Sequence, residues 1–225
     1  MEKNSFQKSF LIFSRYPRLG KVKTRLESNL TTEYCLELHT ALLLDTLDRL
    51  SSLDAACHLF MSDSSEDELL HLAQKFHFPK TIQLHCQKGI NLGERMWNAY
   101  QKISNVSSVA VFFGTDTPNL PLKYIRKVFK TLDRNQVIIG PAEDGGYYLI
   151  ALSEDRRELF QDIDWGTSTV LTQTCSKLSS HEYSLLPPWY DIDNMQDLER
   201  LKNDLRRDCE GFPRRTHCFL KKIQL

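Results

Sequence analysis

Short runs of β-branched and aromatic residues alternate along the chain with longer segments whose apolar residues recur every three or four positions. The short runs predict strands, and several are apolar at every position, as is typical of strands covered by helices on both faces. This alternation predicts an α/β fold with parallel strands joined by crossover helices. We expect the first four strands to form the centre of the sheet. The predicted strands are Phe10–Phe13, Ala56–Met61, Ile82–Cys86, Val109–Phe113, Val137–Ile139, Tyr147–Leu152 and Tyr183–Leu186.

The segments between the predicted strands have the starting signals of helices. Ser65 with Glu68 forms a capping box, Asn91 with Glu94 is a near equivalent, and Pro121 fits the first turn of a helix. Two later helices are expected after possible capping residues, Thr167 and Asn194.

Composition and charge describe an ordinary globular protein of 225 residues, 41% apolar and 26% charged. No repeat or linker divides the chain, so we expect one domain over residues 1–225, with a core at about 8–205 and a basic tail at 206–225. The 29 Lys and Arg residues balance the 29 Asp and Glu residues, so no overall field attracts nucleic acid or an acidic membrane. Any anion site must therefore be local.

The cysteines contain no Cys-x-x-Cys pair, which argues against a zinc ribbon or a redox motif. Free thiols in a reducing compartment are the simplest interpretation. The one apolar run near the N-terminus, Phe10–Phe13, is too short for a signal-peptide core or a membrane span. We therefore expect a cytoplasmic protein. The six cysteines are Cys35, Cys57, Cys86, Cys175, Cys209 and Cys218.

The loop after the first predicted strand is strongly basic. Between positions 15 and 25 it carries five cations and no acidic residue, and ligands of open α/β sheets bind at the carboxyl ends of strands. Gly20 would let the backbone approach a phosphate, and Arg25 could bind two oxygens at once. A solvated basic loop is the competing interpretation. The predicted nucleotide-binding residues are Arg15, Gly20, Lys21, Lys23 and Arg25.

A lone aspartate, Asp116, follows the fourth predicted strand, where a carboxylate could bind a hard cation together with phosphate oxygens. It could equally cap the next helix. Asp193 precedes the last expected helix and has the same two possible roles, with Asn194 as another candidate cap.

Two glycine-containing loops could receive an acceptor. Asp144-Gly145-Gly146 is a good hairpin turn, but its glycines could also let a substrate lie against the backbone while Asp144 orients or activates a hydroxyl. Trp165-Gly166-Thr167 could open a helix whose free N–H groups hold an anion, or Thr167 could simply cap that helix.

Six motifs in this order resemble a known family. They are Phe13 to Leu26, Asn91 to Met96, Gly114 to Leu120, Gly140 to Ile150, and Trp165-Gly166-Thr167 followed by Asp191-Ile192-Asp193. The chain resembles, over roughly Lys8 to Leu205, the radical-SAM/selenodomain-associated transferases. These are GT-A-like members of the nucleotide-diphospho-sugar transferase superfamily, often labelled arsenosugar-biosynthesis glycosyltransferases.

The resemblance implies a three-layer α/β/α GT-A-like fold, a nucleotide bound over the first loop, and Mg²⁺ or Mn²⁺ at Asp116 with Asp193 as the matching second ligand. The implied function is a metal-dependent transferase that moves a group from a nucleotide-activated donor to a small-molecule acceptor, with sugar transfer as the first hypothesis. Because the basic loop is more like that of nucleotidyltransferases, release of pyrophosphate from a nucleoside triphosphate is the alternative. A non-catalytic nucleotide-binding module is the third. Lys23, Arg25 and Asp144 are the expected catalytic residues.

Overall fold

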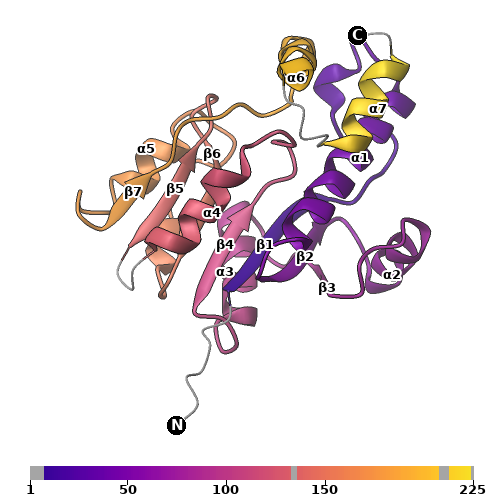
Figure 1. The fold of residues 1–225 in the computed structure, drawn as a ribbon. Helices are drawn as coiled ribbons and strands as arrows, with labels where there is room; N and C mark the ends of the chain where they lie inside the picture. Colours follow the sequence, from indigo (N-terminus) through magenta and orange to yellow (C-terminus); the bar gives the residue numbers. More distant parts are fainter. Residues whose placement is uncertain (1–7, 133–135, 208–212, 224–225) are drawn as a thin grey trace.

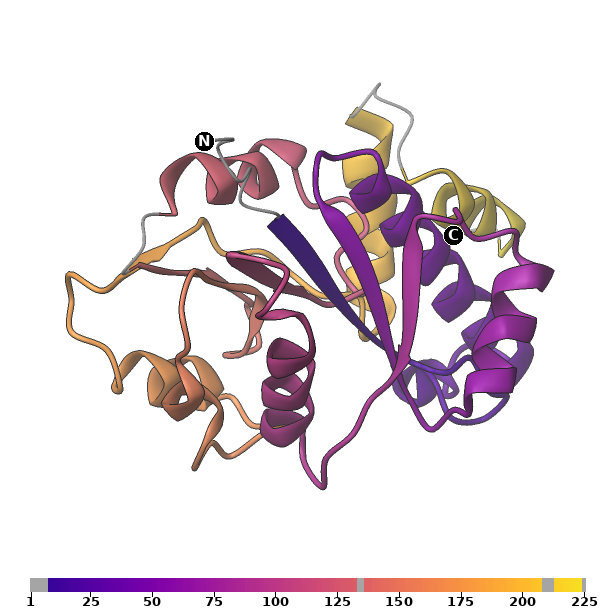
Figure 2. The ribbon, with the colours of Figure 1, turned by 90° about the horizontal axis from the view of Figure 1, so that it is seen from below.

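The computed structural model describes residues 8–132, 136–207 and 213–223. In these residues a seven-stranded sheet is covered by helices on both faces, as the ribbon views show (Figures 1 and 2). The predicted α/β fold with a mostly parallel central sheet is confirmed. The strands lie in the order β3-β2-β1-β4-β6-β5-β7, and β6 alone among them runs antiparallel to its neighbours. Their bounds are β1 Lys8–Arg15, β2 Ala56–Ser62, β3 Ile82–Cys86, β4 Val109–Phe113, β5 Val137–Pro141, β6 Tyr147–Leu152 and β7 Tyr183–Leu185.

Alternate residues of the strands supply two different cores. In β1, Phe10 and Ile12 are buried among residues of α1, α2 and α4, whereas Leu11 is buried with residues of α3 and the short helix η2. This follows from the two-residue repeat of a strand, which sends neighbouring side chains to opposite faces. The elements that cover the sheet are α1 Thr32–Ser51, α2 Glu66–Lys75, α3 Leu92–Ile103, α4 Leu122–Thr131, η2 Arg157–Phe160 and α5 Val170–Cys175.

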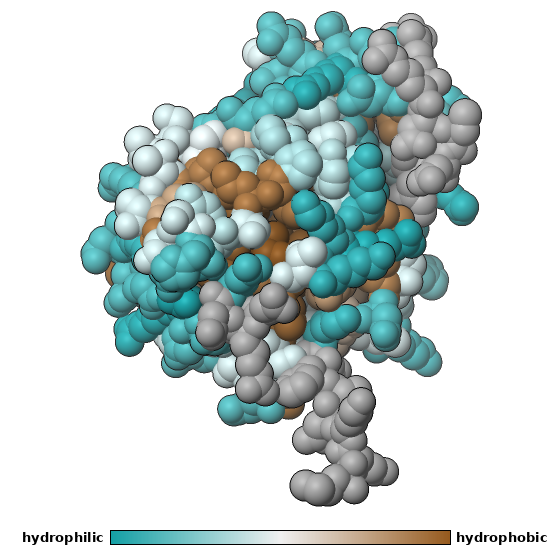
Figure 3. Space-filling view, turned by 60° about the vertical axis from the view of Figure 1, so that its left-hand side comes forward, coloured by the Kyte–Doolittle hydropathy of each residue, from teal (hydrophilic) through white to brown (hydrophobic). Residues whose placement is uncertain are grey.

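The expectation that the first four strands form the centre of the sheet is wrong in one respect. They are neighbours, but β3 lies at an edge and β4 is the middle strand. The pattern of β3 explains this, because Gln83 is exposed and only Ile82 of its five residues is buried. At the opposite edge, Leu185 of β7 is half-exposed. Figure 3, which brings this side of the molecule forward, shows apolar side chains reaching the surface within a hydrophilic surround.

Helix starts follow the predicted capping signals with small differences. Ser65 and Glu68 form the full capping box of α2, and Asn91 accepts the backbone N–H of Glu94 at the start of α3. Pro121 is the residue before α4 rather than within its first turn. The helix expected after Thr167 begins at Val170.

The predicted basic tail contains a packed helix, which is a difference from the sequence expectation. Helices α6 (Met195–Arg207) and α7 (Arg214–Lys222) form a third core with α1. In α7, Thr216, Phe219 and Leu220 are buried, and Thr216 donates its backbone N–H and its hydroxyl to the buried carboxylate of Asp45. The apolar spacing of three and four was present in the sequence, but the surrounding basic residues hid it.

No helix within the described parts of the chain is both long enough and apolar enough to cross a membrane. The cysteines described there carry free thiols, while Cys209 lies outside the described residues.

Candidate functional site

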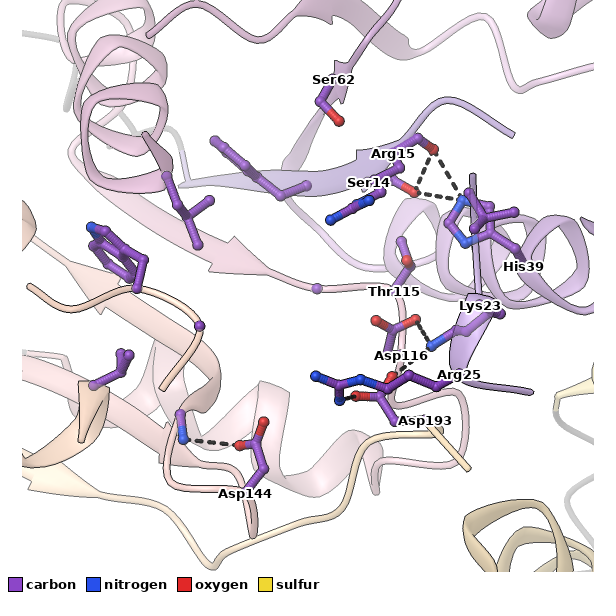
Figure 4. Close-up of a pocket in the computed structure, with 18 of the residues that line it drawn as sticks. Ser14, Arg15, Lys23, Arg25, His39, Ser62, Thr115, Asp116, Asp144 and Asp193 are labelled. Atoms are coloured by element: carbon purple, nitrogen blue, oxygen red, sulfur yellow. Dashed lines mark hydrogen bonds and ion pairs between the residues drawn. The ribbon is translucent and has the colours of Figure 1, made fainter. Parts of the chain in front are cut away.

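A cavity of about 740 Å³ opens at one edge of the sheet. Parallel strands β1, β2, β3 and β4 end at this edge, and the antiparallel strand β6 begins there. Of the predicted site residues, only Gly20 and Gly145 lie outside the cavity lining. Those that line it are Arg15, Lys21, Lys23, Arg25, Asp116, Asp144, Gly146, Trp165, Gly166, Thr167 and Asp193, many of which are drawn in Figure 4.

Lys23 sits at the centre of a charged cluster in this cavity. Its backbone is left-handed, with φ at 50°, and its side chain is only 5% exposed. The ammonium lies 2.7 Å from Asp116 Oδ1 and 3.2 Å from Asp193 Oδ1, and it donates to the carbonyl of Ile192 (Figure 4). Burial alone would lower the pKa of Lys23, but the two carboxylates outweigh it and raise the pKa above its ordinary value. Lys23 is therefore a fixed positive charge.

The other cations of the basic loop divide into two groups. Arg15, Lys21 and Arg25 are exposed and line the cavity, with Arg25 3.1 Å from Asp193 Oδ2. Arg18 is bound instead to Glu68 at 2.6 Å, at the start of α2, and does not line the cavity. The basic loop is thus more than a solvated surface, because three exposed cations and the buried Lys23 line one concave space.

The capping interpretation of Asp116 and Asp193 does not hold. The start of α4 has no side-chain cap, and Asp116 instead pairs with Lys23. At the start of α6, Asn194 accepts the backbone N–H groups of two residues of the helix. Asp193 is left to pair with Lys23 and Arg25. The backbone carbonyl of Asp116 accepts the N–H of Ile192, and this bond holds the two loops together.

Carboxylate oxygens are suitable ligands for Mg²⁺ or Mn²⁺. Oδ1 of Asp116 and Oδ1 of Asp193 are both paired with the Lys23 ammonium, so an ion would be held by the second oxygen of each carboxylate, of which that of Asp193 pairs with Arg25. Burial and the nearby carboxylates of Asp116, Asp144 and Asp193 raise the pKa of Asp191 to about 8, which marks this region as rich in negative charge. Within the described residues, no group of three or more His, Cys, Asp or Glu side chains could hold a metal ion. The residues present fit a divalent ion only if a bound ligand adds further oxygens.

The glycine loop between β5 and β6 is both a hairpin turn and a wall of the cavity. Gly146 donates its N–H to Asp144 Oδ1 at 2.9 Å, which closes the turn. Gly145 has a φ of +92°, and a Cβ there would lie 2.2 Å from the carbonyl oxygen of Ser168. Gly145 is therefore needed for close packing against the neighbouring loop, which explains why it does not line the cavity.

The prediction that Trp165-Gly166-Thr167 opens a helix is wrong, because α5 begins three residues after Thr167 and has six residues. Thr167 donates to the carbonyl of Asp164 and does not cap α5. Trp165 packs edge-on against Tyr147, with ring centroids 6.3 Å apart. These loop residues form the cavity wall facing the hairpin.

Several lining residues were missed by the sequence analysis. Ser62 is the last residue of β2 and Gln87 directly follows β3, so the rule that points to strand ends would have found them. His39 of α1 carried no such signal. It is buried, and its Nε2 lies 3.0 Å from the carbonyl of Arg15, so that this nitrogen carries the proton. Other missed lining residues include Ser14, Arg95, Tyr147 and Ser168.

Comparison with known proteins places this geometry in context. A model of the family described as "Uncharacterized protein conserved in bacteria (DUF2064)" matches residues 35–167. A solved structure of a "putative nucleotide-diphospho-sugar transferase" from Desulfovibrio desulfuricans G20 is 30% identical. It has a TM-score of 0.89, with 97% of this chain and 96% of that chain covered. No curated protein matches the chain significantly.

More distant solved structures share the fold. 4-Diphosphocytidyl-2C-methyl-D-erythritol synthase from Anaerococcus prevotii DSM 20548 is 13% identical with a TM-score of 0.57, covering 90% of this chain and 99% of that one. Rv0371c of Mycobacterium tuberculosis H37Rv, in complex with manganese, is 12% identical with a TM-score of 0.55, covering 88% and 98%. These neighbours show the same fold. On the family match and the 30% identical relative, the chain belongs to the DUF2064 family.

Proposed function

We propose that this protein is a metal-dependent transferase that uses a nucleotide-activated donor, with a nucleotide-diphospho-sugar as the donor and a small molecule as the acceptor. The observation that carries the proposal is the presence of Arg15, Lys21, Lys23 and Arg25 in the same cavity as Asp116 and Asp193. The description of the 30% identical relative supports the sugar donor. We also propose that the protein is similar in function to the radical-SAM/selenodomain-associated and arsenosugar-biosynthesis transferases. It acts in this proposal as a single cytoplasmic domain, without a nucleic-acid or membrane partner.

In this proposal, the exposed cations Arg15, Lys21 and Arg25 bind the donor phosphates and stabilise the charge that grows on the leaving nucleoside diphosphate. Lys23 holds Asp116 and Asp193 in position and adds a fixed charge below the phosphates. A Mg²⁺ or Mn²⁺ ion held by those two carboxylates and the phosphates would supply further neutralisation of the leaving group. Arg15 depends on the bond between its carbonyl and His39, which orients the end of β1.

The acceptor is assigned to the space between the hairpin and the Trp165 loop. Gly146, Trp165, Gly166 and Thr167 line it, and Gly145 supports it from behind. Asp144 uses Oδ1 to close the turn, so Oδ2 is the oxygen available to accept a proton from an acceptor hydroxyl.

Nucleotidyl transfer is the second candidate. What favours it is the number of cations in the cavity, since a pyrophosphate leaving group develops more charge than a nucleoside diphosphate held mainly by a metal.

One experiment separates these functions. The protein is incubated with Mg²⁺ or Mn²⁺ and either nucleotide sugars or nucleoside triphosphates, with candidate small-molecule acceptors, and products are separated by anion exchange. Slow release of nucleoside diphosphate from a nucleotide sugar is the expected result. Pyrophosphate from a triphosphate, with no turnover of any nucleotide sugar, would replace the first function with the second. Binding of donors without either product would leave only a nucleotide-binding module.

A further inference from the structure

Gln87 lies at the end of the cavity farthest along the sheet from the acceptor loops. Across the sheet edge, the cavity passes from Gln87 after β3, to Ser62 of β2, Arg15 of β1, Asp116 after β4 and Tyr147 of β6. Figure 4 shows the middle of this series, with Ser62 and Asp144 on opposite sides of the Lys23 cluster. With phosphates over the cations and the acceptor at the hairpin, the remaining part of a nucleotide falls at the Gln87 end.

The carboxamide of Gln87 has one possible orientation. Its Nε2 donates to the carbonyl of Ser14 at 3.2 Å and to the carbonyl of Phe60 at 3.0 Å, so both amide hydrogens are used. A flipped amide would place Oε1 against two carbonyl oxygens, which cannot donate. Oε1 accepts no hydrogen bond from the described residues, and Gln87 lines the cavity. With both amide hydrogens bonded to backbone carbonyls, Oε1 is the polar atom of this lining side chain that is left to accept a hydrogen bond from a ligand.

The segment that follows Gln87 is held by the first turns of α3. Arg95 Nε donates to the carbonyl of Gly89, Asn98 donates to the carbonyl of Lys88, and the N–H of Ile90 donates to Glu94. The hydrogen-bond acceptor of Gln87 is thus attached to a segment that three hydrogen bonds hold against α3. The same cavity has apolar lining for the faces of a ring, in Phe13 and the 39% exposed Leu92.

We propose that Gln87 selects donors whose nucleobase carries an exocyclic amino group. This rests on the proposed function. An amino group projects beyond the ring and can donate to a fixed acceptor, whereas the ring N–H of uracil is flanked by two carbonyl oxygens whose lone pairs would face the same acceptor. An unmatched polar group in a desolvated site is a strong basis for discrimination.

The test measures the affinities of CDP, UDP, GDP and IDP, each with Mg²⁺, and of inorganic pyrophosphate as a probe of the phosphate site alone. Each pair compares a base that has an exocyclic amino group with a base of the same ring size that has none. CDP and UDP are the pyrimidine pair, and GDP and IDP are the purine pair. In the wild type, the amino member of at least one pair should bind tenfold or more tightly. Gln87→Met should reduce that ratio to less than threefold and leave pyrophosphate affinity unchanged. Gln83→Met, in the strand β3 that precedes Gln87 but outside the cavity, should keep the wild-type ratio.

The outcomes distinguish this inference from the function beneath it. If nucleotides bind to the wild type but neither pair shows a preference, the inference is wrong and the proposed function stands. This measurement does not depend on whether a variant folds. A preference that survives in a folded Gln87→Met protein also overturns it. Failure of the wild type to bind pyrophosphate and every nucleotide would instead reject the proposed function.

Discussion

The ammonium of Lys23 lies 2.7 Å from Asp116 Oδ1, and that oxygen is buried although the Asp116 side chain as a whole is 40% exposed. The two oxygens of one carboxylate therefore face different surroundings. One is paired with a buried cation, and the exposed remainder of the side chain faces the cavity. The burial of Asp116 would raise the pKa of its carboxyl, but Lys23 outweighs burial and holds it below the usual value. Asp116 is thus ionised throughout the neutral range.

Asp116→Asn should abolish Mn²⁺ binding in the presence of saturating nucleotide. The substitution keeps the shape and removes the charge, while Lys23 retains Asp193 and the Ile192 carbonyl, so the free energy of unfolding should fall by no more than about 1 kcal/mol. Isothermal titration of Mn²⁺ measures the effect, with Asp144→Asn as the control on the other side of the cavity. Equal Mn²⁺ binding by wild type and Asp116→Asn would remove Asp116 from the metal site.

Lys23→Met should destabilise the protein by about 1–3 kcal/mol, because two neighbouring carboxylates lose the cation between them and both are partly exposed to solvent. Denaturant unfolding of the single and double variants checks this. In the Lys23→Met background, adding Asp116→Asn should restore part of the loss. Strictly additive effects would show that the pair is not energetically coupled.

Arg25→Ala should weaken nucleotide binding by about 1.5–3 kcal/mol, the contribution of a hydrogen bond to a charged group. Arg18→Ala is the matched control, since Arg18 belongs to the same loop but is bound to Glu68 outside the cavity. Affinities come from calorimetry with a nucleoside diphosphate. Equal losses in both variants would mean that the loop acts through its overall charge and not through a specific phosphate contact.

Gly146→Val should block the acceptor and leave donor binding nearly unchanged. A Cβ at Gly146 has only Asp144 Oδ1 within 3.5 Å, at 3.2 Å, so the fold can accept it. Gly145→Ala should behave differently, losing stability because its Cβ meets the Ser168 backbone and its φ is positive. Steady-state kinetics and thermal unfolding of both variants separate the two roles. Loss of donor affinity together with stability in Gly146→Val would assign both glycines to the turn alone.

The fold should lose stability in mild acid through the paired histidines of β2 and β3. His58 and His85 lie 3.2 Å apart, and burial, followed by the nearby charges of His58 and Lys102, lowers the pKa of His85 to about 4. In the unfolded chain a histidine binds its proton near pH 6.5. The unfolded state therefore binds more protons between about pH 6.5 and 4, and stability falls as pH falls through this window.

Allowing for partial exposure, His85 should contribute about 1–2 kcal/mol of this loss. Urea unfolding from pH 7 to 4 should show a shallower slope in His85→Gln than in the wild type or in the exposed control His71→Gln. An unchanged slope in His85→Gln would place the acid sensitivity elsewhere.

Local patterns in the sequence predicted the strands well, because strands buried on both faces are apolar at each position, as in Val109–Phe113. The order of strands in the sheet was less accessible, since it depends on contacts between distant segments. The exposed Gln83 was the signal that β3 lies at an edge. The basic residues around Phe219 and Leu220 similarly disguised a buried helix.

For the candidate site, residue type and position after a strand were enough to predict that Lys23 and Asp116 lie in one region, and the family resemblance added Asp193. Their mutual pairing could not be predicted, because Lys23 and Asp193 are 170 positions apart and meet only when two loops are brought together by the sheet. The orientation of the Gln87 amide is of the same kind. It is fixed by carbonyls of two neighbouring strands, and no property of Gln87 alone indicates it.

The bond between Thr216 of α7 and the buried carboxylate of Asp45 in α1 has a consequence for synthesis of the protein. The two residues are 171 positions apart, so at about 5–20 residues per second Asp45 leaves the ribosome roughly 10–30 s before its partner. During that interval α1 carries a carboxylate whose donors do not yet exist, and the surface that α7 will cover faces solvent. Helix α1 therefore reaches its final packing only after α7 has been synthesised and has docked against it, so a long-range contact and not local structure completes this helix.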